Sequence, residues 1–502
     1  MGYNAKRGFQ SILGGKVVRS LVGLLTLPIM IRVLGPESYG DYAFLMSTFG
    51  FLMLFVSPSI TEGVQKFIAE DRPRDDWQDQ VARFYFRLAV LLAVLGSVGV
   101  VLGTAFGVVD RVLSERFRLF FYFLAAHVIA IQLRNFVRHA MLGLGLESIT
   151  ESLTTVGMIL MRCGGIVLAA FGLGVVGFLV SELVAAIVVV LGSLWYMRRR
   201  IDVSRLFSAP EVPTRKLLSF NGLNIVTVVL MVSLFHVDVM LLRVMKDGAT
   251  TGYYKAALTL AEYIWIVPKA LESLMIHSAS RMWSRDRESR IQSLSASLTR
   301  YVFLSTSLLA IGILALADSF VPLYFGADFT ASVTPLVLLM PGAVGFALAR
   351  PLYGINKASG RLVPVIAALS FSAAFNAGAN YVLIPIYGLI GAAVTTSVSY
   401  GLMFGLQVAC ARYLGYAPLT NVRPLRLVAT VGLAGPIIYL IDLAVRSDLL
   451  SLIVVPPAGF LVFAGAAIGT GTVDVEEILE FTPGFLTASL ERWLPASVFE
   501  QD

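Results

Sequence analysis

Charged residues are scarce in this chain of 502 residues. Only 14% of the residues are charged, whereas 57% are hydrophobic, and the mean hydropathy is +0.80. A water-soluble protein has to cover its apolar core with a polar exterior, and this composition leaves too few polar residues for that. The scarcity of charge therefore excludes an ordinary soluble fold, and we expect an integral membrane protein.

Cysteine and the motifs of nucleotide chemistry are scarce as well. The two cysteines, Cys163 and Cys410, lie in apolar runs without a CxxC motif or a neighbouring histidine, so we expect neither a disulfide nor a metal site. The chain has no Gly-rich phosphate loop of the Walker type, which argues against direct ATP hydrolysis. We accordingly expect a protein that is not an enzyme, with no catalytic residues and no cofactor.

Apolar runs about 20 residues long dominate what is present, and a helix of that length crosses roughly 30 Å of hydrocarbon. No A-x-A-like cleavage site precedes the first run, so we expect the first helix to be retained. We predict an all-α polytopic membrane protein with fourteen transmembrane helices. The predicted spans are 8–33, 41–63, 83–109, 117–140, 149–171, 175–197, 217–243, 252–276, 297–322, 331–353, 362–384, 388–411, 424–444 and 449–470.

The distribution of Lys and Arg orients these spans. If the N-terminus is cytoplasmic, most Lys and Arg residues fall in cytoplasmic loops, among them the run Arg198-Arg199-Arg200, and few fall outside. We therefore predict a multi-pass protein of the cell membrane with both termini in the cytoplasm. The same bias explains the sequence pI near 9.3, so the basic charge does not require a nucleic-acid partner.

Two segments of the chain resemble each other. "RVLGPESYGDYA" at 32–43 and "RVMKDGATTGYYKA" at 243–256 share an Arg-Val start, a polar turn and a glycine next to tyrosine, and Gly40 and Gly252 are 212 positions apart. Further Gly and Pro pairs recur at offsets of 210 to 216. Spans 1–6 and 7–12 are therefore predicted to be two copies of one six-helix unit, with Gly40 and Gly252 permitting the turn in each copy.

An even number of spans makes both copies enter the membrane from the same side, so the repeat is parallel. Two such bundles that rock about their seam would open a cavity to one side at a time. The predicted domains are an N-terminal lobe at 1–212, a C-terminal lobe at 213–415, two additional helices at 416–471 and a cytoplasmic or interfacial tail at 472–502.

Three stretches of the sequence resemble Wzx-type oligosaccharide-lipid flippases, the polysaccharide transporters of the superfamily that also contains the MATE exporters and the lipid II flippases. They are "RVLGPESYGDYAF" after the first span, "FHVDVMLLRVMKDGATTGYYKAALTLAE" at 235–262 and "LIPIYGLIGAAVTTSVSY" at 383–400. The resemblance covers about residues 8 to 412 and places Asp238 at the acidic position of the seventh span.

This resemblance implies a MATE-like fold and a specific activity. The chain would move a polyisoprenoid (pyro)phosphate-linked sugar or oligosaccharide from the cytoplasmic to the outer leaflet by alternating access, for surface polysaccharide or glycoprotein glycan assembly. The implied partners are the lipid-linked glycan, membrane lipids and the glycosyltransferases or polymerase of the same pathway, and we expect a monomer. The glycan and the lipid carrier stay open.

Cations inside the spans are candidates for holding the phosphate, because buried charge is costly and tends to face a wet cavity. The phosphate-binding candidates are Lys16, Arg19, Arg134 and Arg162. Lys16 and Arg19 share one helix face, although both could instead extend toward the headgroups. Arg162 is nearer the middle of its span, and its alternative is a structural ion pair. We expect Arg138 and Arg350 at the membrane interface.

Acidic and lysine side chains inside the spans are candidates for coupling or gating. They are Asp238, Glu262 and Lys269. A protonatable Asp238 could couple transport to H⁺ or Na⁺, or it could lock the outer gate through a salt bridge or hydrogen bond. Lys269 could instead pair with Glu272, three residues further along the same helix face.

Proline interrupts three of the predicted spans. Pro28, Pro58 and Pro268 are hinge candidates, because a helix can bend where neighbours satisfy the freed carbonyls. The alternative is that all three are static kinks.

Other functions remain open on this sequence. A multidrug or cation exporter of the same fold and a lipid II-type flippase are the alternatives, and a membrane glycan polymerase or ligase is the weaker one. Buried Lys16, Arg19 and Arg162 favour an anionic substrate over a cationic drug.

Overall fold

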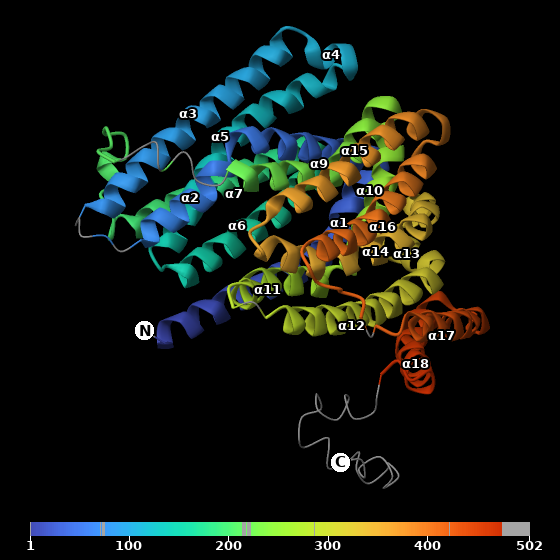
Figure 1. Cartoon of the computed structure of the whole chain (residues 1–502). Coiled ribbons are helices and arrows are strands. Elements are labelled where there is room, and N and C mark those ends of the chain that lie inside the picture. The colour runs from blue at the N-terminus through green and yellow to red at the C-terminus, as the bar shows by residue number, and fades with distance from the viewer. Residues whose placement is uncertain are drawn as a thin grey trace. The chain divides into compact units, whose positions relative to one another are not determined.

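The computed structural model describes residues 2–70, 72, 76–212, 217, 222–285, 287–420 and 422–473, and these residues form helices and no strand (Figure 1). The first helical elements are α1 Gly2–Val56, α2 Pro58–Ala69, α3 Trp77–Ala105, α4 Val108–Val112, α5 Arg116–Gly143, α6 Glu147–Leu168, η1 Ala169–Leu173, α7 Gly174–Met197 and η2 Val203–Arg205. They continue with α9 Gly222–Met245, α10 Gly248–Tyr263, α11 Ile266–Trp283, α12 Glu288–Ala315, α13 Ala317–Phe325, η3 Ala327–Ser332, α14 Val333–Ala358, α15 Leu362–Tyr387, α16 Leu389–Tyr413, α17 Pro424–Ala444 and α18 Asp448–Gly469. The predicted all-α fold is confirmed.

Eleven helical stretches of the described chain are long and apolar enough to cross a membrane. Two of them contain a break at a glycine with positive φ, at Gly35 inside α1 (φ 70°) and at Gly172 in η1 (φ 91°) between α6 and α7. The predicted span 252–276 is divided into α10, of 16 residues, and α11, of 18 residues, and neither helix is among the eleven stretches. Each of the two interrupted stretches covers two predicted spans, and the span at 252–276 is not counted, so eleven stretches correspond to fourteen predicted spans. The count of fourteen crossings stays a prediction.

The three prolines occupy different helical positions. Pro28 lies inside α1, which continues through it. Pro58 is the first residue of α2, although its side chain lies outside the described part of the chain, and Pro268 lies in the first turn of α11. Proline is tolerated in a first helical turn because the N–H it lacks has no intrahelical partner there. The hinge role of these prolines stays a prediction.

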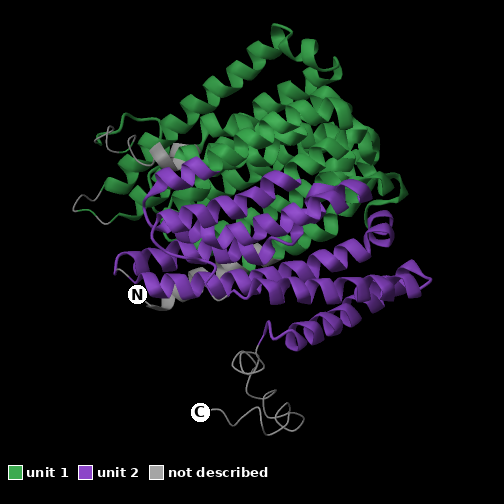
Figure 2. Ribbon diagram, turned by 45° about the vertical axis from the view of Figure 1, so that its right-hand side comes forward, with its two compact units in different colours: residues 1–256, 324–332, 369–396 green, residues 257–323, 333–368, 397–502 purple. Residues whose placement is uncertain are grey.

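The chain divides into two compact units (Figure 2). Unit 1 contains the described residues of 1–256, 324–332 and 369–396, and unit 2 those of 257–323, 333–368 and 397–502. These boundaries differ from the predicted lobes, since α9 and the beginning of α10 group with the first six-helix copy. The lobes and the tail at 472–502 stay predictions, and residues 474–502 lie outside the described part of the chain.

Unit 1 is held together by helices that bury one face and leave another apolar face exposed. A core of α2, α3, α5 and α7 buries large side chains such as Phe67, Tyr85 and Phe136. On α3, Leu95 and Leu102 are exposed. Exposed leucine along a long apolar helix suits contact with lipid, which is as apolar as the side chain itself.

In unit 2, α11 packs against α14, and α12 packs against α14, α17 and α18. Trp265, at the start of α11, is fully buried against the rings of Phe346 and Tyr400, and its Nε1 donates to the carbonyl of Ala343 at 2.7 Å. A buried indole needs such an acceptor because its N–H would otherwise lose its hydrogen bond to water.

The two similar sequence segments meet inside unit 1. A Cβ atom added to Gly40 would lie 1.9 Å from the carbonyl oxygen of Gly248, and one added to Gly252 would lie 2.1 Å from that of Pro36. Gly40 and Gly252 are helical, so the prediction that they permit the turn is wrong. The turn of the first segment is made by Gly35, and the two other glycines allow helix backbones to touch.

This contact predicts a large difference between two Gly→Ala variants. Gly40→Ala should destabilise the protein by at least about 1–3 kcal/mol, because backbone atoms cannot make room for the methyl group. Gly99→Ala on α3 is the matched control, since nothing lies within 4 Å of its Cβ position. The thermal unfolding temperature of the detergent-solubilised variants measures the difference, and equal temperatures would contradict the close packing.

Candidate functional site

Asp238 is fully buried in unit 1 among hydroxyl groups. The hydroxyls of Tyr254 and Thr396 donate to its Oδ2 at 2.5 and 3.1 Å, and the backbone N–H of Val239 donates to Oδ1 at 2.7 Å. Tyr254 comes from α10 and Thr396 from α16. This geometry fits a role of Asp238 in coupling. It fits equally well a role in locking a gate by a hydrogen bond, and both roles stay predictions.

Two buried asparagines of α15 extend this polar cluster. Asn376 Nδ2 lies 3.4 Å from Thr396 Oγ1, and Asn380 Nδ2 donates to Asn376 Oδ1 at 3.2 Å. Both side chains are fully buried, and the Oδ1 of Asn380 has no hydrogen-bond partner among the described residues. One carboxylate with several neutral oxygens is a donor set that hard cations prefer, and a carboxylate can also hold a proton. We call these side chains the Asp238 cluster.

The arginine candidate Arg19 is already paired. Its Nη2 lies 2.6 Å from Oε2 of Glu151 on α6, and its Nη1 lies 3.3 Å from Oγ1 of Thr155. Arg138 of α5 contacts the other oxygen of the same carboxylate at 3.3 Å. Arg138 is therefore part of an internal ion cluster, in addition to being partly exposed. The side chain of Lys16 lies outside the described part of the chain.

Arg134 and Arg162 lie near another buried acid of unit 1, Glu182. Both are close enough to Glu182 of α7 for their charges to act on it. Arg162 Nη1 contacts only the sulfur of Met30 at 3.2 Å, which is a weak acceptor, and its Nε has no partner in the described chain. No hydrogen bond or ion pair of Arg134 occurs among the described residues. The alternative of a fully formed structural ion pair for Arg162 is therefore not supported.

His127 completes this second cluster. Its Nδ1 lies 2.8 Å from the carbonyl oxygen of Phe123, which can only accept, so Nδ1 carries the hydrogen. Its Nε2 then faces Oε2 of Glu182 at 3.5 Å. Neither of these two atoms has a hydrogen-bond partner among the described residues. Arg134, Arg162, Glu182 and His127 thus lie near one another, with the acid and the histidine buried, both arginines partly buried, and two arginine charges against one carboxylate.

A third ionic network joins the similar segments at their polar ends. Asp41 is almost fully buried, and its two oxygens bind Arg243 Nε at 2.6 Å and Arg116 Nη2 at 2.8 Å. The Arg243 guanidinium also lies 4.8 Å above the ring of Phe117. Arg116 reaches a second acid, Glu37, at 2.7 Å. This network ties α1 to α5 and α9 next to the Gly40–Gly248 contact.

The remaining candidates lie in unit 2. Glu262 is partly buried in α10, and Lys269 is exposed with its Nζ 5.4 Å from the ring of Trp265. Glu272 accepts from Arg350 Nη1 at 2.7 Å, and the Arg350 side chain is 8% exposed. Arg350 is thus buried inside the protein, where a carboxylate and the Trp265 and Phe346 rings compensate its charge, and its position at the membrane interface stays a prediction.

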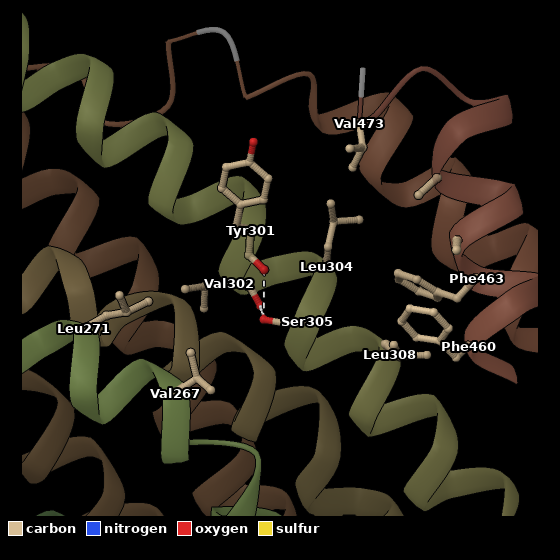
Figure 3. A pocket seen from close by; sticks show the side chains of 12 residues that line it. Val267, Leu271, Tyr301, Val302, Leu304, Ser305, Leu308, Phe460, Phe463 and Val473 are labelled. Carbon is tan, nitrogen blue, oxygen red and sulfur yellow. Dashed lines mark hydrogen bonds between the residues drawn. The ribbon is translucent and has the colours of Figure 1, made fainter. Parts of the chain in front are cut away.

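Unit 2 also contains an apolar pocket of about 470 Å³ between α11, α12 and α18 (Figure 3). Phe460 and Phe463 point into it from α18, and Val267 and Leu271 border it from α11. Its one aliphatic hydroxyl, on Ser305, donates to the carbonyl of Tyr301 at 2.8 Å. The lining of the pocket is therefore apolar and suits an apolar ligand, because it contains hardly any unsatisfied polar group.

The structure brings Arg19, Arg134, Arg162 and Asp238 into one compact unit. Several partners of these residues were not predicted from the sequence, among them Glu151, Tyr254, Asn376, Asn380 and Thr396. A signal for two of them was available, since Asn376 and Asn380 are one helical turn apart in an otherwise apolar span. Within the described residues, no group of three or more His, Cys, Asp or Glu side chains could hold a metal ion.

The fold is that of polytopic membrane transporters. A structure of "Lipid II flippase MurJ, inward closed conformation" matches with a TM-score of 0.72 and 13% identity over 92% of this chain and 97% of that chain. An inward-facing multidrug resistance MATE family transporter of the MOP superfamily matches with a TM-score of 0.66 and 13% identity, over 81% of this chain and 99% of that chain. At this identity the two likenesses show the fold alone, and they confirm the MATE-like expectation.

The chain belongs to the family of polysaccharide biosynthesis proteins, whose family model matches residues 5–267. The resemblance to polysaccharide transporters is thereby confirmed. A similar relative is the "Probable low-salt glycan biosynthesis flippase Agl15" of Haloferax volcanii, which is 25% identical over 245 residues. The match covers 47% of this chain and 49% of that relative, so it spans about half the length of each.

The Asp41 network predicts a strong effect of Arg243→Met. This change leaves the buried Asp41 carboxylate with Arg116 alone, and losing one partner of a buried pair costs about 3 kcal/mol. Arg118→Met, which breaks the exposed Arg118–Asp110 pair, is the control and should cost less than about 1 kcal/mol.

Thermal unfolding of the detergent-solubilised variants checks this expectation. Adding Asp41→Asn to Arg243→Met should recover part of the lost stability, because the unpaired charge is then removed. If Arg243→Met unfolds at the same temperature as Arg118→Met, the Asp41 network does not stabilise unit 1.

Proposed function

We propose that this protein is a flippase that moves a polyisoprenoid (pyro)phosphate-linked sugar or oligosaccharide from the cytoplasmic to the outer leaflet by alternating access. The observation that carries the proposal is the pair of incompletely neutralised arginines, Arg134 and Arg162, inside a membrane protein of the polysaccharide biosynthesis family. The name of the Agl15 relative supports the same assignment.

The arginines supply what an anionic headgroup needs. A phosphate offers several oxygens, and an arginine offers five N–H donors in a planar arrangement that can bind two of them at once. Arg162 has at least one buried N–H without a partner in the described chain. A phosphate bound there would gain hydrogen bonds that the unliganded protein leaves unmade. A cationic drug, the substrate of a multidrug exporter, would be repelled by the same charges.

The apolar pocket of unit 2 supplies the complementary chemistry. A polyisoprenoid tail has no hydrogen-bonding groups. The lining of the pocket by α11, α12 and α18 is almost wholly apolar, so it leaves no hydrogen-bonding group unsatisfied when such a tail binds. Burial of apolar surface contributes roughly 25 cal/mol per Å², so a pocket of this kind retains a long hydrocarbon chain without fixing its headgroup. We assign the headgroup to the arginines of unit 1, and we assign to this pocket only the binding of a hydrocarbon chain.

Coupling belongs to the Asp238 cluster in this proposal, with H⁺ or Na⁺ as the coupling ion. Asp238 supplies the negative charge, and Thr396, Asn376 and Asn380 supply neutral oxygens around it. Glu262 and Lys269 are the remaining gating candidates. The protein acts as a monomer in the cell membrane with both termini in the cytoplasm, alongside the glycosyltransferases or polymerase of its pathway. It performs transport and catalyses no covalent step.

Arg162→Gln tests the phosphate anchor. Loss of a hydrogen bond to a charged group costs about 1.5–3 kcal/mol, so transport should fall by about tenfold or more. Glycan display is measured in cells that depend on this protein, together with the lipid-linked saccharide left on the cytoplasmic face. Arg111→Gln, at an exposed position of α4, is the control. Wild-type display by folded Arg162→Gln and Arg134→Gln variants would reject the anchor.

Asp238→Asn tests coupling. The amide keeps the size of the side chain and removes its negative charge, so the dependence of transport on Na⁺ concentration or on pH should disappear. Asp328→Asn, an exposed acid in the same unit, should keep the wild-type dependence. Uptake of a labelled lipid-linked saccharide into vesicles at several pH and Na⁺ values measures both, and an unchanged dependence in Asp238→Asn removes this residue from the coupling role.

A further inference from the structure

Glu151 is held by its arginines in a loose arrangement. The Arg19–Glu151 contact is close at 2.6 Å, but Oε2 does not meet hydrogen-bond geometry. The second contact, from Arg138, is long at 3.3 Å, whereas charge-assisted hydrogen bonds are typically about 2.7–2.9 Å. The Nε of Arg138 is buried without a partner among the described residues. One carboxylate thus neutralises two guanidinium groups and satisfies few of their donors.

The surroundings of the Glu151 carboxylate could accommodate an anion that accepts more hydrogen bonds than a carboxylate does. Thr155 donates its hydroxyl hydrogen to the carbonyl of Glu151 at 2.8 Å, so its oxygen is left to accept from Arg19. A Cβ atom at Gly15 would lie 3.0 Å from Oε2 of Glu151, so the missing side chain provides the space in which carboxylate and guanidinium meet. The Arg19 and Arg138 side chains are 16% and 35% exposed, while that of Glu151 is 5% exposed.

This cluster adjoins the cluster around Glu182. Arg134 and Arg138 are four residues apart on α5 and therefore lie on one face, about 6 Å apart along the helix axis. Glu151, Thr155 and Arg162 follow one face of the neighbouring helix α6 at spacings of four and seven. An anion that binds Arg19 and Arg138 is thus one helical turn from Arg134, on a polar track that continues to Arg162.

We propose that Glu151 is an internal substitute for the substrate phosphate. When no substrate is bound, its carboxylate neutralises Arg19 and Arg138. A phosphate mono- or diester displaces the carboxylate, because it brings more acceptor oxygens to donors that Glu151 leaves unused. Glu151 thereby makes the site selective, since a ligand with fewer acceptor oxygens gains nothing over the carboxylate it has to displace. This inference rests on the proposed function, which requires that the ligand carry a phosphate.

The test uses the full-length protein in phosphatidylcholine nanodiscs with polyisoprenyl monophosphate as the probe. Polyisoprenol of equal length is the neutral comparison, and phosphatidylglycerol and inorganic phosphate show whether a bulk lipid headgroup or free phosphate suffices. Binding and unfolding temperature are measured for wild type, Glu151→Gln and the matched control Glu147→Gln. Glu147 is one turn earlier on the same helix, at its first residue.

Removal of the competing carboxylate should tighten binding of polyisoprenyl monophosphate about tenfold in Glu151→Gln, a change of about 1.4 kcal/mol, and leave polyisoprenol binding unchanged. Without probe, Glu151→Gln should unfold at a lower temperature than wild type, because two guanidinium groups lose their counter-ion. The phosphate probe should restore that temperature and polyisoprenol should not. Glu147→Gln should behave as wild type.

Two results overturn the proposal in different ways. If wild type binds the monophosphate better than polyisoprenol but Glu151→Gln binds it equally or more weakly, Glu151 is not a substitute and the phosphate anchor stands. If wild type shows no preference for the phosphate, the anchor and the substitute both fail. Glu151→Ala serves as a second variant should Glu151→Gln not fold, and tighter monophosphate binding is again expected, because the competing carboxylate is removed.

Discussion

A charged side chain in an apolar interior has to find an opposite charge or several hydrogen-bond partners, because no water is present to solvate it. In unit 1 this constraint governs the arrangement of the helices. Asp41 draws α5 and α9 onto α1, and Glu151 draws together α1, α5 and α6. Each acid forms ion pairs with arginines from different helices. Burying these charges costs free energy, and the ion pairs that offset this cost also determine which helices are neighbours.

The clusters differ in how completely their charges are satisfied, and in the proposed function this difference separates structural networks from binding sites. Asp41 has a short, aligned contact from Arg243 and a second arginine, as a structural network should. Asp238 has hydroxyl donors but no cation at hydrogen-bond distance in the described chain, while Arg162 retains an unpaired N–H. A protein that only needed stability would replace such groups with apolar ones. The proposed function gives these groups a use, as an anchor for an anion at the arginines and as a site for the coupling ion at Asp238.

The fold could be predicted to a large extent, because membrane helices leave a long apolar signal that does not depend on their neighbours. Their breaks were harder to assign. The turn after the first span was correctly placed in "RVLGPESYGDYA", but the glycine that makes it is Gly35, whereas Gly40 serves a helix contact. Both roles favour glycine, so residue type alone could not distinguish them. The same holds for Pro58 and Pro268, which occupy first helical turns rather than the middle of a helix.

The sequence by itself determined the membrane environment, the helical class, the family resemblance and the short list of charges placed where charge is expensive. Each of these follows from composition or from local spacing along one helix. Only the tertiary structure decided how those charges are paired: Arg19 with Glu151, Arg350 with Glu272, and Asp238 with Tyr254 and Thr396. These partners lie up to 158 positions apart in the chain. Their meeting depends on which helix faces pack together, and a single sequence carries no record of that packing.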